Sequence, residues 1–410
     1  MDILTNSSTS AYSDLFSSLE ESLSKMLSII RKHLDMDVAF FSEFVGGRRV
    51  FTAVDQSEDA TVKILAGDSD PLEDTYCEKI AFGKMSQIIH DASIHHITSN
   101  LAITDVLKIG SYIGVPIILT NGDTYGTLCC FKHSADGSLN QRDINFLIAF
   151  AEIYRDLYED QIKDSSLMDE VSEKIRSVLE LDLWSMHYQP IYDCRANSIS
   201  GFESLARFNT EPYAPPNIWF SEAAQIGMGE RLEIEAIKKA LSNINKLNNN
   251  TYLSINISPE FILNGALVRA LQNINLERVV LEVTEHSPIQ HYQTFHQQLS
   301  PLRARGLGLA IDDAGAGYSS FQHVLELEAD IIKLDISLIR NIHMEPKKYA
   351  LAKALCAFAK ATKCIIIAEG VEIVEELNVL NELGVDRIQG YLIGKPMPIA
   401  EAVAHTYHLP

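Results

Sequence analysis

The stretch from Gly306 to Ser320 places two adjacent carboxylates at the end of an apolar run. Leu307 to Ile311 is the apolar run, and Asp312 and Asp313 follow it directly. A short apolar run bounded by turn residues predicts a buried strand, and two neighbouring carboxylates at its end repel each other strongly in a low dielectric. A bound divalent cation would keep both ionised. The alternative is a solvated turn, because acidic residues and glycines are common in turns.

Polar groups of the same kind stand at the ends of other apolar runs in the second half of the chain. They are Glu203, Asn256, Glu282, Lys333 with Asp335, Glu369 and Gln389. In a barrel of parallel strands the carboxyl-terminal strand ends converge on one face, which holds the active site. Oxygen ligands suit Mg²⁺ or Mn²⁺, and the set contains no His or Cys that would favour Zn²⁺. The set predicts a divalent metal site, because burying this much negative charge without cations is very unfavourable.

The elements that must position these groups begin near Trp184. From there onward, short apolar runs alternate with helical stretches, which predicts a parallel sheet covered by helices on both faces. About eight such units indicate a (β/α)8 TIM-like barrel, an α/β fold, over 181–410. The first two segments, MHYQPIYD and SISGFESL, predict an antiparallel pair and therefore an irregular first strand.

The first part of the chain has a helix, sheet, helix order. Its predicted elements are a helix over Tyr12 to Leu34, a hairpin over Asp37 to Ala53, a strand pair across Asn121-Gly122-Asp123, and a long helix from Gln141 towards Leu179. This order predicts an α+β domain over 1–160. The segment 161–180 would be a helix that links the two domains.

The long helix carries apolar residues at steps of three and four. They are Leu147, Phe150, Tyr154 and Leu157 and, after a polar interruption, Leu167, Val171, Ile175 and Val178. Such a helix could pair with its twin from a second subunit. A single amphipathic helix packed on its own domain explains the same spacing, because the repeat is shorter than about three to four clean heptads.

The overall composition limits the partners and the compartment. The net charge of −21 argues against a basic surface that coats a nucleic-acid polymer. No apolar run approaches the roughly 20 residues that span a membrane, so we expect no membrane insertion. The six cysteines form no CxxC pair, which favours buried thiols in a reducing, cytoplasmic setting.

The first part resembles a GAF domain, a common small-molecule sensor module. The resemblance lies in MDVAFFSEFVGGRRVF, IGSYIGVPI and TYGTLCCF, and no motif identifies a ligand. Cys77 could carry a chromophore thioether, but its setting does not resemble a bilin-attachment motif and a buried structural cysteine is the stronger interpretation. His90, His95 and His96 could ligate haem or metal, and here a solvated loop is the stronger interpretation.

The second part resembles the EAL-domain cyclic di-GMP phosphodiesterases. Glu203-Ser204-Leu205-Ala206-Arg207 is similar to the E-A-L-x-R signature, and the match continues through SINIS, LEVTEH, KLD, AEGVE and QGY. The resemblance implies hydrolysis of cyclic di-GMP to linear pGpG with two Mg²⁺ or Mn²⁺ ions. It also implies control by the GAF sensor and a homodimer.

The resemblance assigns roles to the metal-site residues. One ion would be held by Glu203, Asn256, Glu282 and Asp312, and a second by Asp312, Asp313 and Glu369. Lys333 would orient the attacking water or receive its proton, and it forms the catalytic set together with Glu203 and Glu369.

The remaining roles concern the substrate and one loop. Arg207 would grip a substrate phosphate. The other substrate contacts would come from Gln189, Asp335, Glu372 and Gln389. Glu285 would anchor the loop that follows the two aspartates.

Two departures from the family pattern bear on the activity. Ser204 replaces an alanine, and the loop reads DDAGAGYSS where DDFGTGYSS is usual, so that Ala314 and Ala316 replace an aromatic residue and a hydroxyl. Because every metal-site residue is present, we expect catalysis to survive, at a lower rate or with more dependence on the sensor. The alternatives are a weak or inactive EAL domain that acts as a cyclic di-GMP receptor or interaction module, and a scaffold in which the GAF half carries the function.

Overall fold

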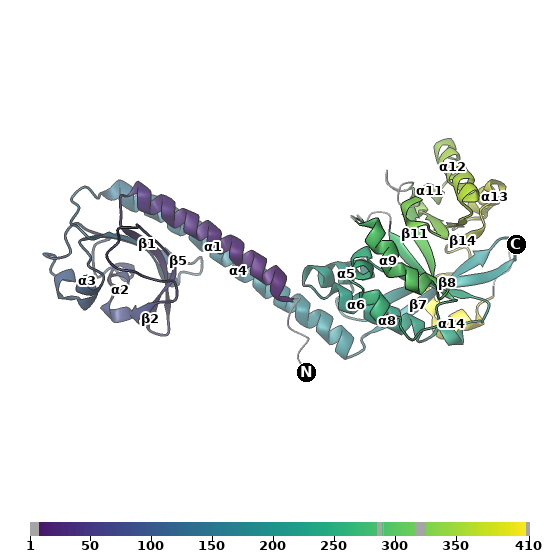
Figure 1. The fold of residues 1–410 in the computed structure, drawn as a ribbon, viewed down its shortest axis with the longest axis horizontal. Coiled ribbons are helices and arrows are strands. Elements are labelled where there is room, and N and C mark those ends of the chain that lie inside the picture. The colour runs from purple at the N-terminus through teal and green to yellow at the C-terminus, as the bar shows by residue number, and fades with distance from the viewer. Residues whose placement is uncertain (1–7, 285–288, 290, 316–324, 407–410) are drawn as a thin grey trace. The chain divides into compact units, whose positions relative to one another are not determined.

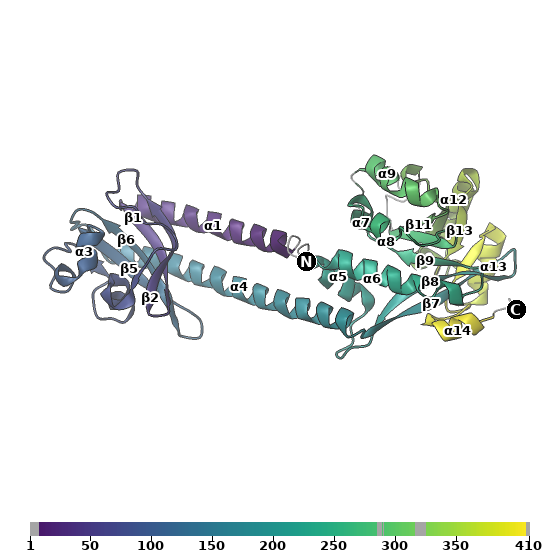
Figure 2. The same cartoon turned by 60° about the horizontal axis from the view of Figure 1, so that its bottom comes forward.

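The chain forms two compact units, Met1–Glu170 and Val171–Pro410 (Figures 1 and 2). The computed structural model describes residues 8–284, 289, 291–315 and 325–406. Each unit has its own sheet and its own hydrophobic clusters. Over the described ranges, none of the helices combines the length and the apolar character needed to cross a membrane.

A six-stranded antiparallel sheet forms the centre of the first unit. The strand order is β3-β2-β1-β6-β5-β4. The strands are β1 (Val38–Val45), β2 (Arg48–Gln56), β3 (Ser69–Pro71), β4 (Ile88–Ile89), β5 (Ser111–Ile118) and β6 (Thr124–Lys132). The helices are α1 (Ser8–His33), α2 (Tyr76–Ala81), α3 (Ala102–Val106) and α4 (Gln141–Glu180). Helices α1 and α4 overlap in Figure 1 and are drawn apart in Figure 2.

Side chains of the central strands enter a hydrophobic cluster on each face of this sheet. Phe41 of β1 joins Leu27 of α1 and Leu147 of α4 in one cluster. Its neighbour Phe40 joins Ile80 of α2 in the other. Successive strand residues point to opposite faces, so both faces are covered and the predicted α+β order is confirmed.

Helix α4 continues through the polar segment 163–166 without a break. Leu147 and Tyr154 of α4 lie in a core of the first unit, and Ile175 and Val178 lie in the core of the second. These members of the predicted pairing stripe are buried within the chain itself. That burial favours the alternative in which the helix packs on its own domains.

The second unit is a closed barrel. Its strands are β7 (Trp184–Asp193), β8 (Ser198–Phe208), β9 (Tyr252–Asn256), β10 (Val279–Thr284), β11 (Gly308–Ala314), β12 (Ile331–Leu334), β13 (Ile365–Ala368) and β14 (Arg387–Gln389), with the short β15 (Met397–Pro398) outside the ring. The ring closes between β14 and β7. Strand β7 is antiparallel to both neighbours in the ring, whereas the pairs from β8 to β14 are parallel. The predicted TIM-like barrel with an irregular first strand is confirmed.

Helices follow most of the barrel strands. They are α5 (Pro216–Gln225), α6 (Gly229–Leu241), α7 (Pro259–Leu263), α8 (Ala266–Ala270), α9 (Tyr292–Arg303), α11 (Ile336–Ile339), α12 (Pro346–Thr362), α13 (Val374–Leu383) and α14 (Ile399–Ala404). Figure 2 shows them around the outside of the strands. The large core cluster lies between these helices and the sheet.

A small apolar cluster lies beneath the polar strand ends. It contains Ile191, Val280, Ala310, Ile331 and Ile367. Each of the last four residues is followed, two positions later in the sequence, by a polar residue. These polar residues are Glu282, Asp312, Lys333 and Glu369. Because residues two apart in a strand share a face, the four polar side chains point the same way as the apolar layer.

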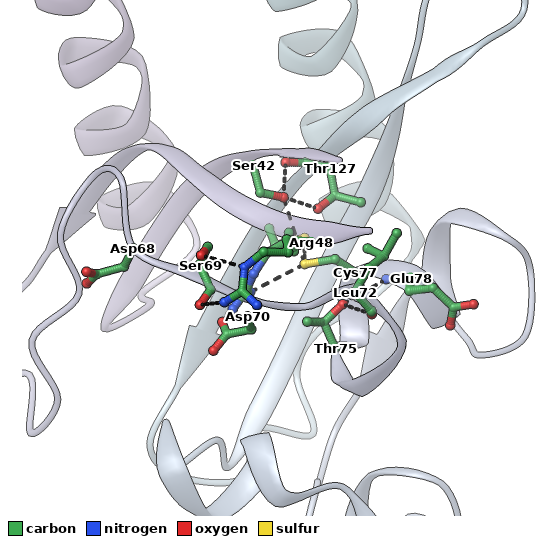
Figure 3. Close-up of polar contacts among 12 residues, drawn as sticks. Ser42, Arg48, Asp68, Ser69, Asp70, Leu72, Thr75, Cys77, Glu78 and Thr127 are labelled. Carbon is green, nitrogen blue, oxygen red and sulfur yellow. Dashed lines mark hydrogen bonds and ion pairs between the residues drawn. The ribbon is translucent and has the colours of Figure 1, made fainter. Parts of the chain in front are cut away.

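A buried arginine lies among apolar side chains of the first unit. The side chain of Arg49 is 2% exposed, and its guanidinium donates to Asp70 and, at 3.6 Å, to the sulfur of Cys77. Cys77 is fully buried, and Figure 3 shows it beside Ser42, whose hydroxyl lies 3.9 Å from its sulfur. Burial raises the pKa of Cys77, but a hydrogen bond with Cys129 and the charge of Arg49 outweigh it and hold that pKa well below its usual value. Cys77 is thus part of a buried network, as the structural interpretation expects.

The histidine segment of the first unit is a partly exposed loop. His95 and His96 have ring centroids 4.6 Å apart, and His90 contacts the carbonyl of Asp136 at 2.9 Å. Among the described residues, the groups of three or more close potential metal ligands all lie in the barrel.

Arg49→Met is expected to destabilise the first unit, because it removes the buried cation from Asp70 and Cys77. Breaking a buried ion pair costs ~3–5 kcal/mol, and we expect the lower value since Asp70 is 29% exposed. Both tryptophans, Trp184 and Trp219, belong to the second unit. Urea unfolding followed by circular dichroism should therefore show an earlier transition, with the tryptophan fluorescence transition unchanged.

Arg48→Met is the matched control for this change. Arg48 is the preceding residue, and its side chain makes exposed hydrogen bonds to Ser69. Its replacement should change the free energy of unfolding by at most about 0.5 kcal/mol. Equal stability of the two variants would show that the buried pair contributes nothing.

Candidate metal centre

Lys333 is the centre of a ring of carboxylates inside the barrel. Its side chain is 0% exposed on β12. Its Nζ lies 2.7 Å from Glu369, 2.8 Å from Glu282, 3.1 Å from Asp312 and 3.6 Å from Glu203. These four acids come from segments far apart in the sequence, and the barrel brings them to one ammonium group.

The register of the strands places two amide side chains beside Glu203. Asn256 ends β9 and donates to Glu203 Oε1 at 3.1 Å. Gln389 ends β14 and donates to Glu203 Oε2 at 2.6 Å and to Gln189 Oε1 at 3.2 Å. Gln189 stands opposite Glu203 in the β7–β8 pair. The carboxylate of Glu203 is thus oriented by donors on both of its oxygens.

An irregularity in β11 directs two successive carboxylates to the same place. The pairing of β11 with β12 shifts between Ile311 and Ala314, and Asp313 has a φ of 60°. Adjacent side chains of a regular strand point to opposite faces. The bulge removes that alternation, so Asp312 and Asp313 can both reach the group that includes Glu369.

The acidic oxygens form two groups that share Asp312. Oxygens of Glu203, Glu282 and Asp312 lie within 4.8 Å of one another, and so do oxygens of Asp312, Asp313 and Glu369. The structure brings together the six residues to which the resemblance gives metal roles, with Asn256 hydrogen-bonded to the first group.

The charges of this cluster are not balanced by Lys333 alone. Burial lowers the pKa of Lys333, but four carboxylates outweigh it and raise that pKa well above its usual value. Burial and the negative charge of Glu203 raise the pKa of Glu282 well above its usual range. Burial also raises the pKa of Glu369 to about 8, helped by Asp312 and Glu203 and opposed by Lys333. Protons on Glu282 and Glu369 can therefore offset part of the negative charge, and a divalent cation bound here would displace them.

The donor set fits hard divalent cations. All the charged donors are carboxylates, and Asp312 Oδ1 is a buried oxygen that lies 3.1 Å from Lys333 Nζ and has no hydrogen-bond partner among the residues that the structure describes. An oxygen of this kind is available to a cation. Ions of the size and hardness of Mg²⁺ or Mn²⁺ suit such a site.

A cavity of about 350 Å³ adjoins the cluster. Its walls include Arg207, Asn256 and Glu282, so the predicted phosphate-binding arginine and two predicted metal-site residues face the same space. Glu233 on α6 also lines it and accepts hydrogen bonds from the backbone and the hydroxyl of Ser258.

Four other residues singled out in the sequence are not placed in the acidic groups by the structure. Asp335 accepts a hydrogen bond from Ser337 N at 2.8 Å and caps α11. Glu372 makes two hydrogen bonds to Arg340, each of 2.5 Å. Glu285 and Ala316 lie outside the described residues, so their predicted roles stay predictions.

Sequence reasoning missed two groups that support the ligands. The hydroxyl of Ser254 donates to Glu282, and it stands opposite Glu203 in the β8–β9 pair. Ser254 could have been found, because it precedes Asn256 by two residues and so shares its strand face. Glu233 could not, because a single acid on an amphipathic helix gives no sign of which loop it will meet.

Comparison with known proteins identifies both parts of the chain. The EAL domain family matches residues 172–396, more than half of the chain, and the GAF domain family matches residues 18–154. A relative named cyclic di-GMP phosphodiesterase PdeR, from Escherichia coli K12, is 31% identical over 55% of this chain and 35% of its own length. Cyclic di-GMP phosphodiesterase NbdA from Pseudomonas aeruginosa is 29% identical over 56% of this chain and 31% of its own length.

A solved structure resembles the second unit. It is described as a PaMucR phosphodiesterase in complex with c-di-GMP, is 25% identical, and covers 57% of this chain and 99% of its own with a TM-score of 0.53. The chain spans about a third of the length of the two curated relatives. From the matched families and the barrel with its acidic centre, we conclude that this chain belongs to the EAL domain family and that a GAF domain precedes its EAL domain.

Proposed function

We propose that this protein hydrolyses cyclic di-GMP to linear pGpG with the help of divalent metal ions. The observation that carries the proposal is the pair of carboxylate groups that share Asp312 around the buried Lys333. Membership of the EAL domain family and relatives named as cyclic di-GMP phosphodiesterases support the choice of substrate.

The residues that would hold the ions are those of the two acidic groups. Glu203, Asn256, Glu282 and Asp312 would hold one ion, and Asp312, Asp313 and Glu369 the other. Bound there, Mg²⁺ or Mn²⁺ would stabilise the charge that develops on the phosphate and make a water more acidic. The excess of carboxylates over Lys333 supports this assignment.

The chain's own residues would bind and orient the substrate. Arg207 faces the cavity beside the metal centre and would hold a phosphate with its planar fork of donors. Gln389 donates hydrogen bonds to both Gln189 and Glu203. The two glutamines would hold the Glu203 carboxylate in place and contact the nucleotide. Asp335 and Glu372 remain proposed substrate contacts, and binding would then compete with their present hydrogen bonds to Ser337 and Arg340.

The reaction needs one water and cleaves one ester bond. The water oxygen forms a bond to phosphorus, the bond from phosphorus to the 3′ oxygen breaks, and the proton removed from water ends on that oxygen. Lys333 would hold the water in line. Burial lowers its pKa, but the four carboxylates outweigh burial and keep the side chain an ammonium, so receiving the proton of the water would require bound cations that lower this pKa. The product is a linear dinucleotide with a 5′ phosphate.

We also propose a setting for this activity. All six cysteines are free thiols, which suits a reducing cytoplasm. The GAF domain would regulate turnover through a ligand of its own. A homodimer is supported by the exposed apolar side chains Ile153, Leu157 and Leu167, which lie within one face of α4.

Purified protein is expected to convert cyclic di-GMP to pGpG when Mg²⁺ or Mn²⁺ is present and to stop when EDTA removes the metal. Glu203→Gln should lower kcat at least about 100-fold, because it removes a charge from a proposed metal ligand. Chromatography of the nucleotides measures both effects. Nucleotide that binds but stays intact would support the receptor alternative instead.

Lys333→Met is expected to destabilise the metal-free protein, because four carboxylates, each at most 16% exposed, lose the one cation that the described residues place beside them. Removing one partner of a buried ion pair costs ~3–5 kcal/mol. Added Mn²⁺ should restore part of the loss, so the rise in Tm with Mn²⁺ should be larger for the variant than for the natural protein. Differential scanning calorimetry measures both, and equal rises would contradict the charge balance described above.

Light scattering is expected to give twice the chain mass of 45.7 kDa. The double variant Ile153→Glu with Leu157→Glu should be monomeric, because the two side chains lie one turn apart on the same face of α4 and charge there would oppose its burial. Lys163→Glu, at a side chain that is 69% exposed on the same helix, should remain a dimer. A dimer that survives the double change would exclude this surface as the interface.

A further inference from the structure

Glu376 is a fully buried carboxylate that joins two loops of the barrel. Its side chain is 0% exposed on α13. Its Oε1 accepts a hydrogen bond from the backbone N–H of Asn341 at 3.0 Å, and its Oε2 accepts one from the backbone N–H of Glu372 at 3.1 Å. Each oxygen therefore holds the backbone of a different loop.

The two loops follow the strands that carry the metal centre. Strand β12 contains Lys333, and the chain continues through the short α11 to Asn341. Strand β13 ends one residue before Glu369, and Glu372 is three residues further on. The bridge made by Glu376 thus connects the segment after Lys333 with the segment after Glu369.

Two further contacts join the same loops. Arg340 pairs with Glu372 through two hydrogen bonds of 2.5 Å. At Gly370, whose φ is 65°, an added Cβ would lie 2.2 Å from a side-chain carbon of Ile336. The segment that carries Glu369 therefore runs directly against α11, and an added side chain could not be accommodated there without a shift.

The burial of Glu376 has a physical cost that its hydrogen bonds must offset. A buried carboxylate without partners is strongly unfavourable, and backbone N–H donors to an anion form strong, charge-assisted bonds. An apolar residue at this helix position would be buried at no such cost but would leave two backbone donors unpaired. The carboxylate at 376 is therefore suited to holding the two loops together.

We propose that Glu376 is a positioning residue for the metal centre. It fixes the loop after Glu369 to the loop after Lys333 and so preserves the 2.7 Å approach of Glu369 to Lys333. A fixed Glu369 binds an ion together with Asp312 and Asp313 without first losing conformational freedom. The proposal rests on the metal sites of the proposed function.

The test is calorimetric titration of the metal-free full chain with Mn²⁺. Glu376→Ala should weaken binding at the site of Asp312, Asp313 and Glu369 by at least about tenfold, as is usual when a group that orients a ligand is lost. The other site should keep its affinity. Glu376→Gln retains one acceptor oxygen and should show an intermediate loss.

Glu375→Ala is the matched control, because Glu375 is the exposed neighbour on the same helix. It should bind Mn²⁺ as the natural protein does. A merely structural role for Glu376 would lower the fraction of protein that binds, seen as a lower stoichiometry, and would leave the Kd unchanged. That result would overturn the proposal, as would an unchanged Kd at full stoichiometry.

The outcomes of this titration also distinguish a failure of the positioning role of Glu376 from a failure of the proposed metal sites. Natural protein that binds no Mn²⁺ would overturn the metal sites and with them the role of Glu376. Natural protein that binds two ions, with a Glu376→Ala variant of equal affinity, would overturn the positioning role alone. If Glu376→Ala fails to fold, the Kd of Glu376→Gln decides.

Discussion

The metal centre depends on a charge imbalance that only a closed barrel can create. Four carboxylates surround one buried ammonium, and burial, together with the negative charge of Glu203, raises the pKa of Glu282. In water such acids would stay apart, because like charges repel and each is well hydrated. The hydrogen-bonded ring of strands holds them together, and the apolar layer around Ile331 excludes water from below. The folded barrel thus holds together carboxylates of the kind that bind divalent cations.

Much of this centre was predictable, because strand residues alternate and parallel strands end on one face. Glu203, Glu282, Asp312 and Glu369 each end or follow an apolar run, so their meeting could be expected before any coordinates were known. The shift of register at Asp313 could not, because a bulge depends on how β11 pairs with β12 rather than on either segment alone. The DDAGAGYSS loop lies partly, and its predicted anchor Glu285 wholly, outside the described ranges, so the effect of this loop stays a prediction.

In the first unit, the sequence pattern predicted the secondary structure but not the buried charged residue. The sheet and its flanking helices followed from apolar spacing, and the order of elements is confirmed. The burial of Arg49 beside Cys77 was not foreseen, because a charged residue next to Arg48 in the sequence GGRRVF reads as an exposed strand end. Burial of a charge is decided by a distant partner, here Asp70, and such a partner has no fixed spacing in the sequence. The same reason hides Glu376 and Glu233 from sequence analysis.

The reversed direction of β7 determines where the chain enters the barrel. In a barrel of uniformly parallel strands, the first strand starts at the rim opposite the catalytic face. Here Trp184, the first residue of β7, pairs with Phe208 at the carboxyl end of β8, so the entry point lies on the catalytic rim. Helix α4 ends four residues before this point, and β7 leads from it directly to Gln189 beside Glu203. A twist or axial shift at the end of α4 would therefore be delivered to the reacting side of the domain through one strand, with no need to cross the barrel.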